Sequence, residues 1–149
     1  MAQNEFDQAL YLFNHGEYYD SYQTFGSHPV EGEGNNRFRF TVWAPNAQSV
    51  SVIGDFTDWD EGMPLERYGE TGVWTGKLDH VYEGQCYKYR VVQEDGTVVN
   101  KIDPYGFEFE VRPKDATVIK RLPQKEWNDQ DWLSKRKEQP IYNQPLNIY

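Results

Sequence analysis

Hydrophobic residues recur with a helical period near the start of the 149-residue chain and with a strand period further on. Residues 5–15 place four apolar side chains at i, i+3, i+4 and i+7: Phe6, Ala9, Leu10 and Phe13. This spacing predicts a short amphipathic helix, which Asn4 can cap and Gly16 can end. The following segment, 17–36, is rich in turn-forming residues and is expected to be irregular.

From residue 37 onward the period changes to two. Segment 37–44 carries alternate apolar residues: Phe38, Phe40, Val42 and Ala44. The same pattern predicts further strands at 49–53, 72–78, 86–93, 97–101, 108–111 and 116–119. Turn signals such as Asp95-Gly96 and Asp103-Pro104 separate them. We therefore expect an all-β fold, an immunoglobulin-like antiparallel β-sandwich with a short N-terminal helix and a C-terminal linker segment.

The pattern divides the chain into three parts. An N-terminal helix and leader occupy 1–36, the β-sandwich occupies 37–120, and a linker occupies 121–149. A short helix is predicted within the linker at 127–137. Its end carries Lys135, Arg136 and Lys137. Positive charge there complements a helix C-terminus, so we interpret this cluster as structural.

The net charge and the cysteine content indicate which binding partners and which cellular compartment the sequence favours. The net charge of −9 opposes binding to phosphate backbones and anionic lipid, so neither nucleic acid nor a membrane is an expected partner. No apolar run approaches the roughly 20 residues of a membrane span, and residues 1–8 have neither the basic nor the apolar region of a signal peptide, so none is expected. The single cysteine, Cys86, excludes an intrachain disulfide and favours the cytoplasm.

A search for catalytic and metal-binding patterns finds none. The chain has three scattered histidines, His15, His28 and His80, without a nucleophile motif or zinc spacing. Four acidic residues crowd one loop: Asp55, Asp58, Asp60 and Glu61. They lack the order of ligands that a calcium loop needs, so we interpret them as a solvated acidic turn. We therefore expect no catalytic residue, metal or cofactor.

Aromatic residues make up 16% of the chain and suit either a core or a sugar-binding surface. Trp59 lies between two acids in a polar loop, where it can form a partly exposed platform or anchor the loop by packing. Trp43 and Trp74 lie within strand patterns and are more readily interpreted as core. Lys88 alternates with Tyr87 and Tyr89, so it should point away from their face, toward a sugar hydroxyl or simply toward water.

Several segments together resemble the family 48 carbohydrate-binding module. They are 40–47 (FTVWAPNA), 50–60 (VSVIGDFTDWD), 72–74, 87–89 and 101–105. This module precedes the catalytic barrel in glycogen-branching and debranching enzymes, and it also forms the glycogen-binding domain of AMP-activated kinase β subunits. The resemblance implies α-1,4-glucan or glycogen as a partner.

The flanking segments are similar to branching enzymes, at 11–29, 107–119 and 127–149. Such enzymes cleave an α-1,4-glucan and transfer the released segment to a 6-hydroxyl, which makes an α-1,6 branch. Their catalytic residues belong to a (β/α)₈ barrel, so this chain alone should be inactive. The barrel would be its second partner. Residues expected to pack against it are Trp127, Trp132, Ile148 and Tyr149.

This sequence contains only some of the residues that bind glycogen in the kinase domain. Its loop tryptophan matches Trp59 and its strand lysine matches Lys88, which become the candidate carbohydrate-binding residues. Its second stacking tryptophan has no counterpart, because Asp95-Gly96 is followed by 97–99 (TVV). We therefore expect weak glucan affinity. Alternative interpretations are a freestanding glycogen-sensing regulatory module, a purely structural protein-contact domain, and a module of a debranching relative.

Overall fold

The computed structural model describes residues 3–32, 36–122, 126–138 and 145. Its helices are α1 (Gln3–Asn14) and α2 (Gln130–Glu138), with short 3-10 turns η1 (Ser21–Gln23) and η2 (Asp55–Thr57). Its strands are β1 (Gly26–Pro29), β2 (Arg37–Trp43), β3 (Ala47–Gly54), β4 (Met63–Pro64), β5 (Glu66–Arg67), β6 (Val73–Asp79), β7 (Cys86–Gln93), β8 (Val98–Lys101), β9 (Glu108–Phe109) and β10 (Thr117–Val118).

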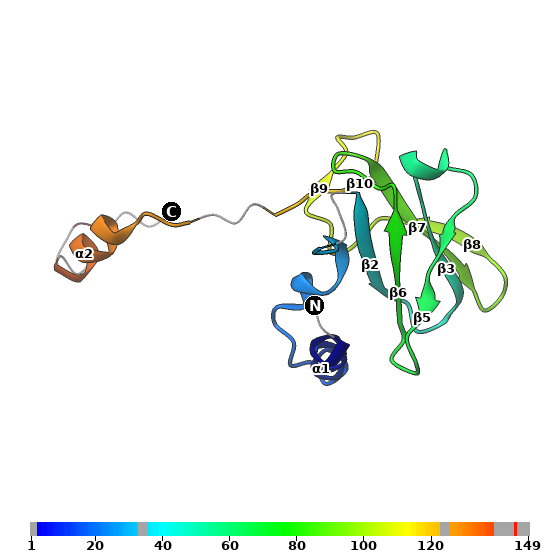
Figure 1. Ribbon diagram of the computed structural model, residues 1–149, viewed down its shortest axis with the longest axis horizontal. Helices are drawn as coiled ribbons and strands as arrows, with labels where there is room; N and C mark the ends of the chain where they lie inside the picture. The colour runs from blue at the N-terminus through cyan, green and yellow to red at the C-terminus, as the bar shows by residue number, and fades with distance from the viewer. Residues whose placement is uncertain (1–2, 33–35, 123–125, 139–144, 146–149) are drawn as a thin grey trace.

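The described strands form two antiparallel sheets that face each other (Figure 1). One sheet has the order β1-β2-β6-β5, and the other has the order β4-β3-β7-β10-β9, with β8 paired to β7. The prediction of an immunoglobulin-like antiparallel β-sandwich with a short N-terminal helix is confirmed. Because β3 and β7 are antiparallel, Gly54 lies opposite Tyr87 at one end of the sandwich and Ala47 lies opposite Gln93 at the other.

The core lies between the sheets and follows the predicted alternation. Phe38, Phe40 and Val42 of β2 point inward, opposite inward side chains of β3 and β7. The buried cluster comprises Phe38, Phe40, Val42, Ala47, Val50, Val52, Leu65, Trp74, Leu78, Val81, Tyr87, Tyr89 and Ile119. Full burial of each large apolar side chain contributes about 1.5–3 kcal/mol before entropy is counted.

Helix α1 packs on part of the outer face of the β1-β2-β6-β5 sheet. Its Phe6 and Leu10 pack with Phe25 and Val73 in a second buried cluster, which confirms the predicted apolar face. The helix ends at Asn14, and Gly16 follows with φ of 73°, a backbone conformation that glycine adopts without strain.

Several local features differ from the sequence-based expectation. The helix begins at Gln3, so Asn4 lies in its first turn and is not the cap. Strand β1 lies in the segment expected to be irregular, and it pairs with β2 along its whole length. Strands β4 and β5 were also not predicted. These are short strands containing proline or charged residues, whose pairing is dictated by the longer neighbouring strand rather than by their own pattern.

A buried carboxyl group lies where the sequence indicated only a turn. Asp103 is fully buried, and its Oδ2 accepts hydrogen bonds from the hydroxyls of Tyr87 (2.6 Å) and Tyr89 (2.9 Å). Its Oδ1 accepts from the backbone N–H of Tyr105 at 2.8 Å, and its own N–H donates to Thr117 Oγ1 at 2.9 Å. Asp103 therefore joins β7 to the segments around β9 and β10.

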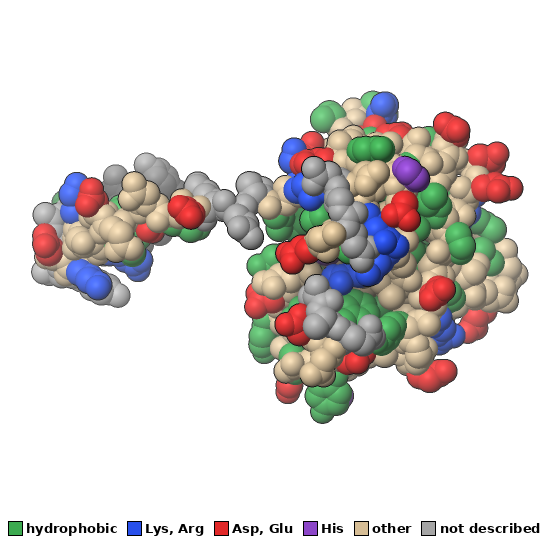
Figure 2. Space-filling model, viewed as in Figure 1, with side chains coloured by type: hydrophobic (Ala, Val, Ile, Leu, Met, Phe, Trp, Pro, Cys, Tyr) green, Lys and Arg blue, Asp and Glu red, His purple; other side chains and the backbone are tan. Residues whose placement is uncertain are grey.

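The predicted linker helix is present as α2, and its last turn contains all three basic residues. Trp132 on this helix is 57% exposed, and Trp127 before it is also exposed. Ile148 and Tyr149 lie outside the described residues, so the expectation for them stays a prediction. On the face of the sandwich shown in Figure 2, acidic side chains are scattered, whereas the largest group of lysine and arginine side chains lies near the middle.

Candidate functional site

The loop after β3 has a tightly defined backbone. Gly54 leaves β3 so close to β7 that a Cβ there would lie 2.3 Å from the Cys86 carbonyl oxygen. The Gly54 N–H donates to Thr57 Oγ1 at 3.0 Å, and the Trp59 N–H donates back to the Gly54 carbonyl at 3.1 Å. Asp58 and Trp59 both adopt positive φ, 50° and 61°. Such strain in a bulky residue persists only where its surroundings hold it.

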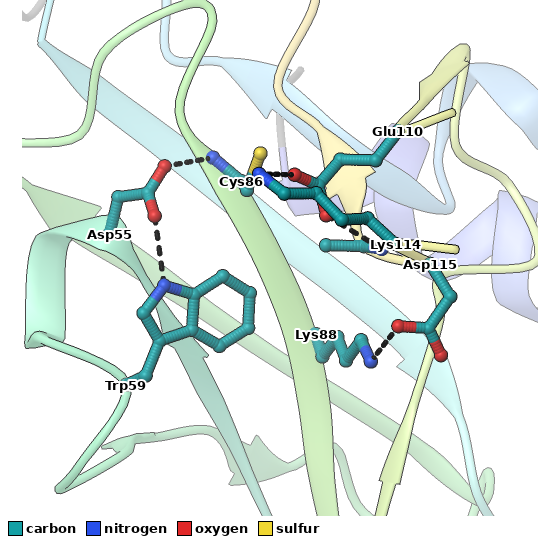
Figure 3. A network of polar contacts seen from close by, with 8 residues as sticks. Asp55, Trp59, Cys86, Lys88, Glu110, Lys114 and Asp115 are labelled. Atoms are coloured by element: carbon teal, nitrogen blue, oxygen red, sulfur yellow. Dashed lines mark hydrogen bonds and ion pairs between the residues drawn. The ribbon is translucent and has the colours of Figure 1, made fainter. Parts of the chain in front are cut away.

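Asp55 holds the Trp59 side chain in place (Figure 3). The indole Nε1–H donates to Asp55 Oδ1 at 2.8 Å, while Oδ2 accepts from the backbone N–H of Cys86 at 2.7 Å. One carboxylate therefore fixes the indole to the start of β7. Trp59 is 37% exposed, so part of its ring remains available for a ligand.

Lys88 extends from β7 on the outer face of the sheet, while Tyr87 and Tyr89 point into the core, as their alternation predicts. Its Nζ forms an ion pair with Asp115 Oδ1 at 2.5 Å (Figure 3). An ammonium group has three donors, so this pair leaves donors for other acceptors.

The facing wall is the segment between β9 and β10. Lys114 Nζ lies 3.1 Å from Glu110 Oε1, and Glu110 Oε2 accepts from the Ala116 N–H at 3.3 Å. The hydrogen bond from Lys114 lowers the pKa of Glu110, and the same contact raises the pKa of Lys114. Both groups are therefore charged at neutral pH and present fixed acceptors and donors.

Between these parts lies an open hollow of about 300 Å³, which brings together Trp59 and Lys88. Its wall combines an aromatic ring with paired acids and lysines, and the charges largely neutralise one another. Burial, reinforced by the nearby Asp55 and Glu110 carboxylates, raises the pKa of the Cys86 thiol at its floor, so this cysteine is not an activated nucleophile. The lining suits an uncharged ligand with an apolar face and many hydroxyls.

Asp55 and Asp115 were not identified as site residues from the sequence. The spacing of four residues between Asp55 and Trp59 could have indicated their contact, but Asp55 was interpreted as part of a solvated acidic turn. Asp115 had no signal, because only the pairing of β10 with β7 brings it beside Lys88. Within the described residues no three His, Cys, Asp or Glu side chains gather as metal ligands. Residues 97–99 on the β7–β8 hairpin supply no aromatic ring.

Comparison with known families and proteins gives consistent matches. Residues 24–106 match the model of carbohydrate-binding module 48 (isoamylase N-terminal domain). The 1,4-alpha-glucan branching enzyme GlgB of Bacillus caldolyticus is 42% identical over 150 residues, covering 100% of this chain and 22% of that protein. The enzyme of the same name from Synechococcus sp. is 42% identical over 140 residues, covering 93% of this chain and 18% of that protein. The chain thus spans about a fifth of the length of these relatives.

Solved structures agree on the fold. A Klebsiella pneumoniae pullulanase complexed with maltotriose matches with a TM-score of 0.53 and 19% identity, over 64% of this chain and 9% of that one. The Group B Streptococcus pullulanase SAP matches with a TM-score of 0.52 and 22% identity, over 66% of this chain and 14% of that one. No helix among the described residues is long and apolar enough to span a membrane. With a family match over residues 24–106 on a β-sandwich of the expected topology, the chain belongs to the carbohydrate-binding module 48 family.

Proposed function

We propose that this chain is the N-terminal module of a 1,4-α-glucan branching enzyme, which transfers α-1,4-glucan segments to form α-1,6 branches in glycogen biosynthesis in the cytoplasm. Relatives of that name align along nearly the whole chain, including the segments outside the family match. The bond cleavage and transfer belong to a catalytic barrel of the parent protein. The division into a leader at 1–36, a sandwich at 37–120 and a linker at 121–149 remains a prediction, to which β1 adds a strand from the leader.

The module's own role in this proposal is to bind α-glucan in the hollow beside Trp59. The observation that carries it is the partly exposed indole, fixed by Asp55 and placed beside Lys88. A pyranose ring can stack on the indole while its hydroxyls meet the Lys88 ammonium and the Asp115 carboxylate. A single stacking contact supplies only about 0.5–1.5 kcal/mol beyond the burial of area, so we expect weak binding.

Packing on the catalytic barrel is the second part of the proposal. Trp127 and Trp132 expose large aromatic surfaces in the linker. Exposed apolar surface of this kind favours contact with another domain. In the parent protein the module would then hold a glucan chain close to the barrel.

The test is calorimetric titration of the 149-residue chain with maltoheptaose. Trp59→Ala should lower the binding heat, because the stacking surface of this hollow is removed. Trp132→Ala is the matched control, since it removes an exposed tryptophan outside the hollow and should bind as the unmodified chain does. Circular dichroism and urea unfolding of both variants establish that the sandwich is intact.

The outcomes separate the interpretations. A folded Trp59→Ala variant that binds maltoheptaose unchanged would show that the hollow is not the glucan site. No heat for the unmodified chain at about 1 mM sugar, where binding is worth about 4 kcal/mol, would instead support the structural protein-contact domain. Equal losses in Trp59→Ala and Trp132→Ala would also count against a specific site at Trp59.

A further inference from the structure

A second hollow, of about 600 Å³, lies at the other end of β3. The antiparallel pairing of β3 with β7 brings the β2–β3 turn beside the β7–β8 hairpin at this end. Apolar side chains, including Trp43, Pro45 and Val91, form part of the lining. Asn46, Gln93 and Glu94 add polar groups. The site described above uses none of these residues.

Trp43 differs from a core tryptophan in its exposure. It is 51% exposed, whereas Trp74 on the neighbouring strand is buried and donates its indole N–H to the Ala44 carbonyl at 2.9 Å. The interpretation of Trp43 as core is therefore wrong, while that of Trp74 is confirmed. The strand alternation turns Trp43 outward, where the ring centroid of Phe13 from α1 lies 6.1 Å away.

The indole of Trp43 is held by close packing around Gly72. A Cβ on Gly72 would lie 3.0 Å from Trp43 Nε1 and 2.9 Å from Pro45 Cβ, and Gly72 also has φ of 76°. Glycine is therefore required at this position for the β2–β3 turn and the indole to approach the neighbouring backbone. The ring is preorganised in the wall of the hollow, which limits the entropy lost when a ligand binds.

Backbone and side-chain hydrogen bonds also fix the polar rim. The Gln93 N–H donates to the Thr97 carbonyl at 2.9 Å, and Gln48 Nε2 donates to the Glu94 carbonyl at 3.0 Å. The Asp95 carboxylate accepts from the Thr97 N–H at 2.9 Å. These bonds hold the hairpin in one arrangement and place its side chains beside the aromatic ring.

The chemistry of the lining selects a class of ligand. The described lining includes the acids Glu94 and Asp95 and neither lysine nor arginine, so a phosphate or other anion is repelled. An aromatic face flanked by amides and carboxylates matches a neutral molecule with both C–H faces and hydroxyl donors. A sugar ring has this combination.

We propose that the hollow at Trp43 is a second α-glucan site. The identity of the sugar rests on the proposed function, whereas the site itself rests on the lining at this end. Seven residue steps of β3 at about 3.3 Å each separate the two ends by roughly 23 Å, and Figure 1 shows β3 running between them. If one long glucan contacts both hollows, the second contact is intramolecular, and the affinity for long chains should then exceed that for short ones.

The test uses the tryptophan indole N–H signals in ¹H–¹⁵N spectra of the 149-residue chain, which has five tryptophans. Single Trp→Phe variants assign the signals. With maltoheptaose, the Trp43 and Trp59 signals should shift with saturating dose dependence, while those of Trp74 and Trp132 stay in place. In the Trp59→Ala variant the Trp43 signal should still titrate, because the two hollows share no lining residue. Gln93→Ala, which removes an amide from the lining and leaves Gly72 and Pro45 unchanged, should weaken the Trp43 response about two- to tenfold.

Each outcome bears on one claim. A Trp59 shift with a stationary Trp43 signal would overturn the second site and leave the proposed function in place. A Trp43 shift with a stationary Trp59 signal would support the second site and overturn the assignment at Trp59. Stationary signals from both would overturn both. Equal Trp43 shifts with a β-linked cello-oligosaccharide would contradict the α-glucan class.

Discussion

At the scale of single residues, Asp103 is the clearest case of a polar group that organises an aromatic core. Burial raises the pKa of Asp103, and hydrogen bonds from Tyr87 and Tyr89 oppose the rise without cancelling it. Burial and the nearby carboxyl group raise the pKa values of both tyrosines well above their ordinary range. The tyrosines therefore stay protonated as donors, and Asp103 serves as the common acceptor.

The raised pKa gives a defined pH dependence. The folded chain binds the Asp103 proton more tightly than the unfolded chain, so this contribution to stability is complete below about pH 3.8 and is lost as the pH rises through the folded pKa. A side-chain amide does not ionise in this range, so Asp103→Asn removes this slope. Urea unfolding from about pH 3.5 to 7 should show the stability of the unmodified chain falling relative to the variant. A constant difference across this range would contradict the assignment.

At the scale of elements, a helix or strand was easiest to predict where its hydrophobic pattern extends over many residues. The helix α1 and strands β2, β6 and β7 each present enough alternating or helical positions for the period to be recognised. The Asp95-Gly96 turn also fixed the β7–β8 hairpin. In contrast, β1, β4 and β5 are short and contain Pro29, Pro64 or charged residues. Their strand conformation comes from pairing with β2, β3 and β6, which a local pattern does not encode.

Substitutions in helix α1 test how much this helix contributes to the stability of the sandwich. Leu10 is buried against Phe25 and Val73, so Leu10→Ala should lower the free energy of unfolding by about 2–4 kcal/mol through lost burial and a cavity. Tyr11→Ala changes the neighbouring, exposed position and should cost no more than about 0.5 kcal/mol. Urea unfolding at matched conditions measures both. Similar small losses would show that α1 docks without stabilising the sandwich.

At the scale of the whole molecule, both hollows depend on the register in which β3 pairs with β7. Sequence reasoning found Trp59 and Lys88 separately, and the pairing of Ile53 with Lys88 brings the loop beside the lysine. It missed Asp115 and the exposure of Trp43, because both depend on which segment covers which sheet face. Alternation determines that Trp43 points outward, but only the position of α1 decides whether the outward face is covered.

The charge of the whole molecule predicts how glucan binding responds to salt. The chain carries a net charge of −9, but a neutral glucan experiences no net force from it, and stacking on Trp59 is not screened. Raising the salt from about 0.05 to 0.5 M shortens the Debye length from about 14 to 4 Å, so the maltoheptaose affinity should change by less than about twofold. Calorimetry at both salt concentrations, with Trp132→Ala as a reference variant, measures this. If the maltoheptaose affinity instead falls by much more than twofold, contacts that salt screens, rather than stacking on Trp59, dominate the binding, and the assignment of the indole as the main contact would be wrong.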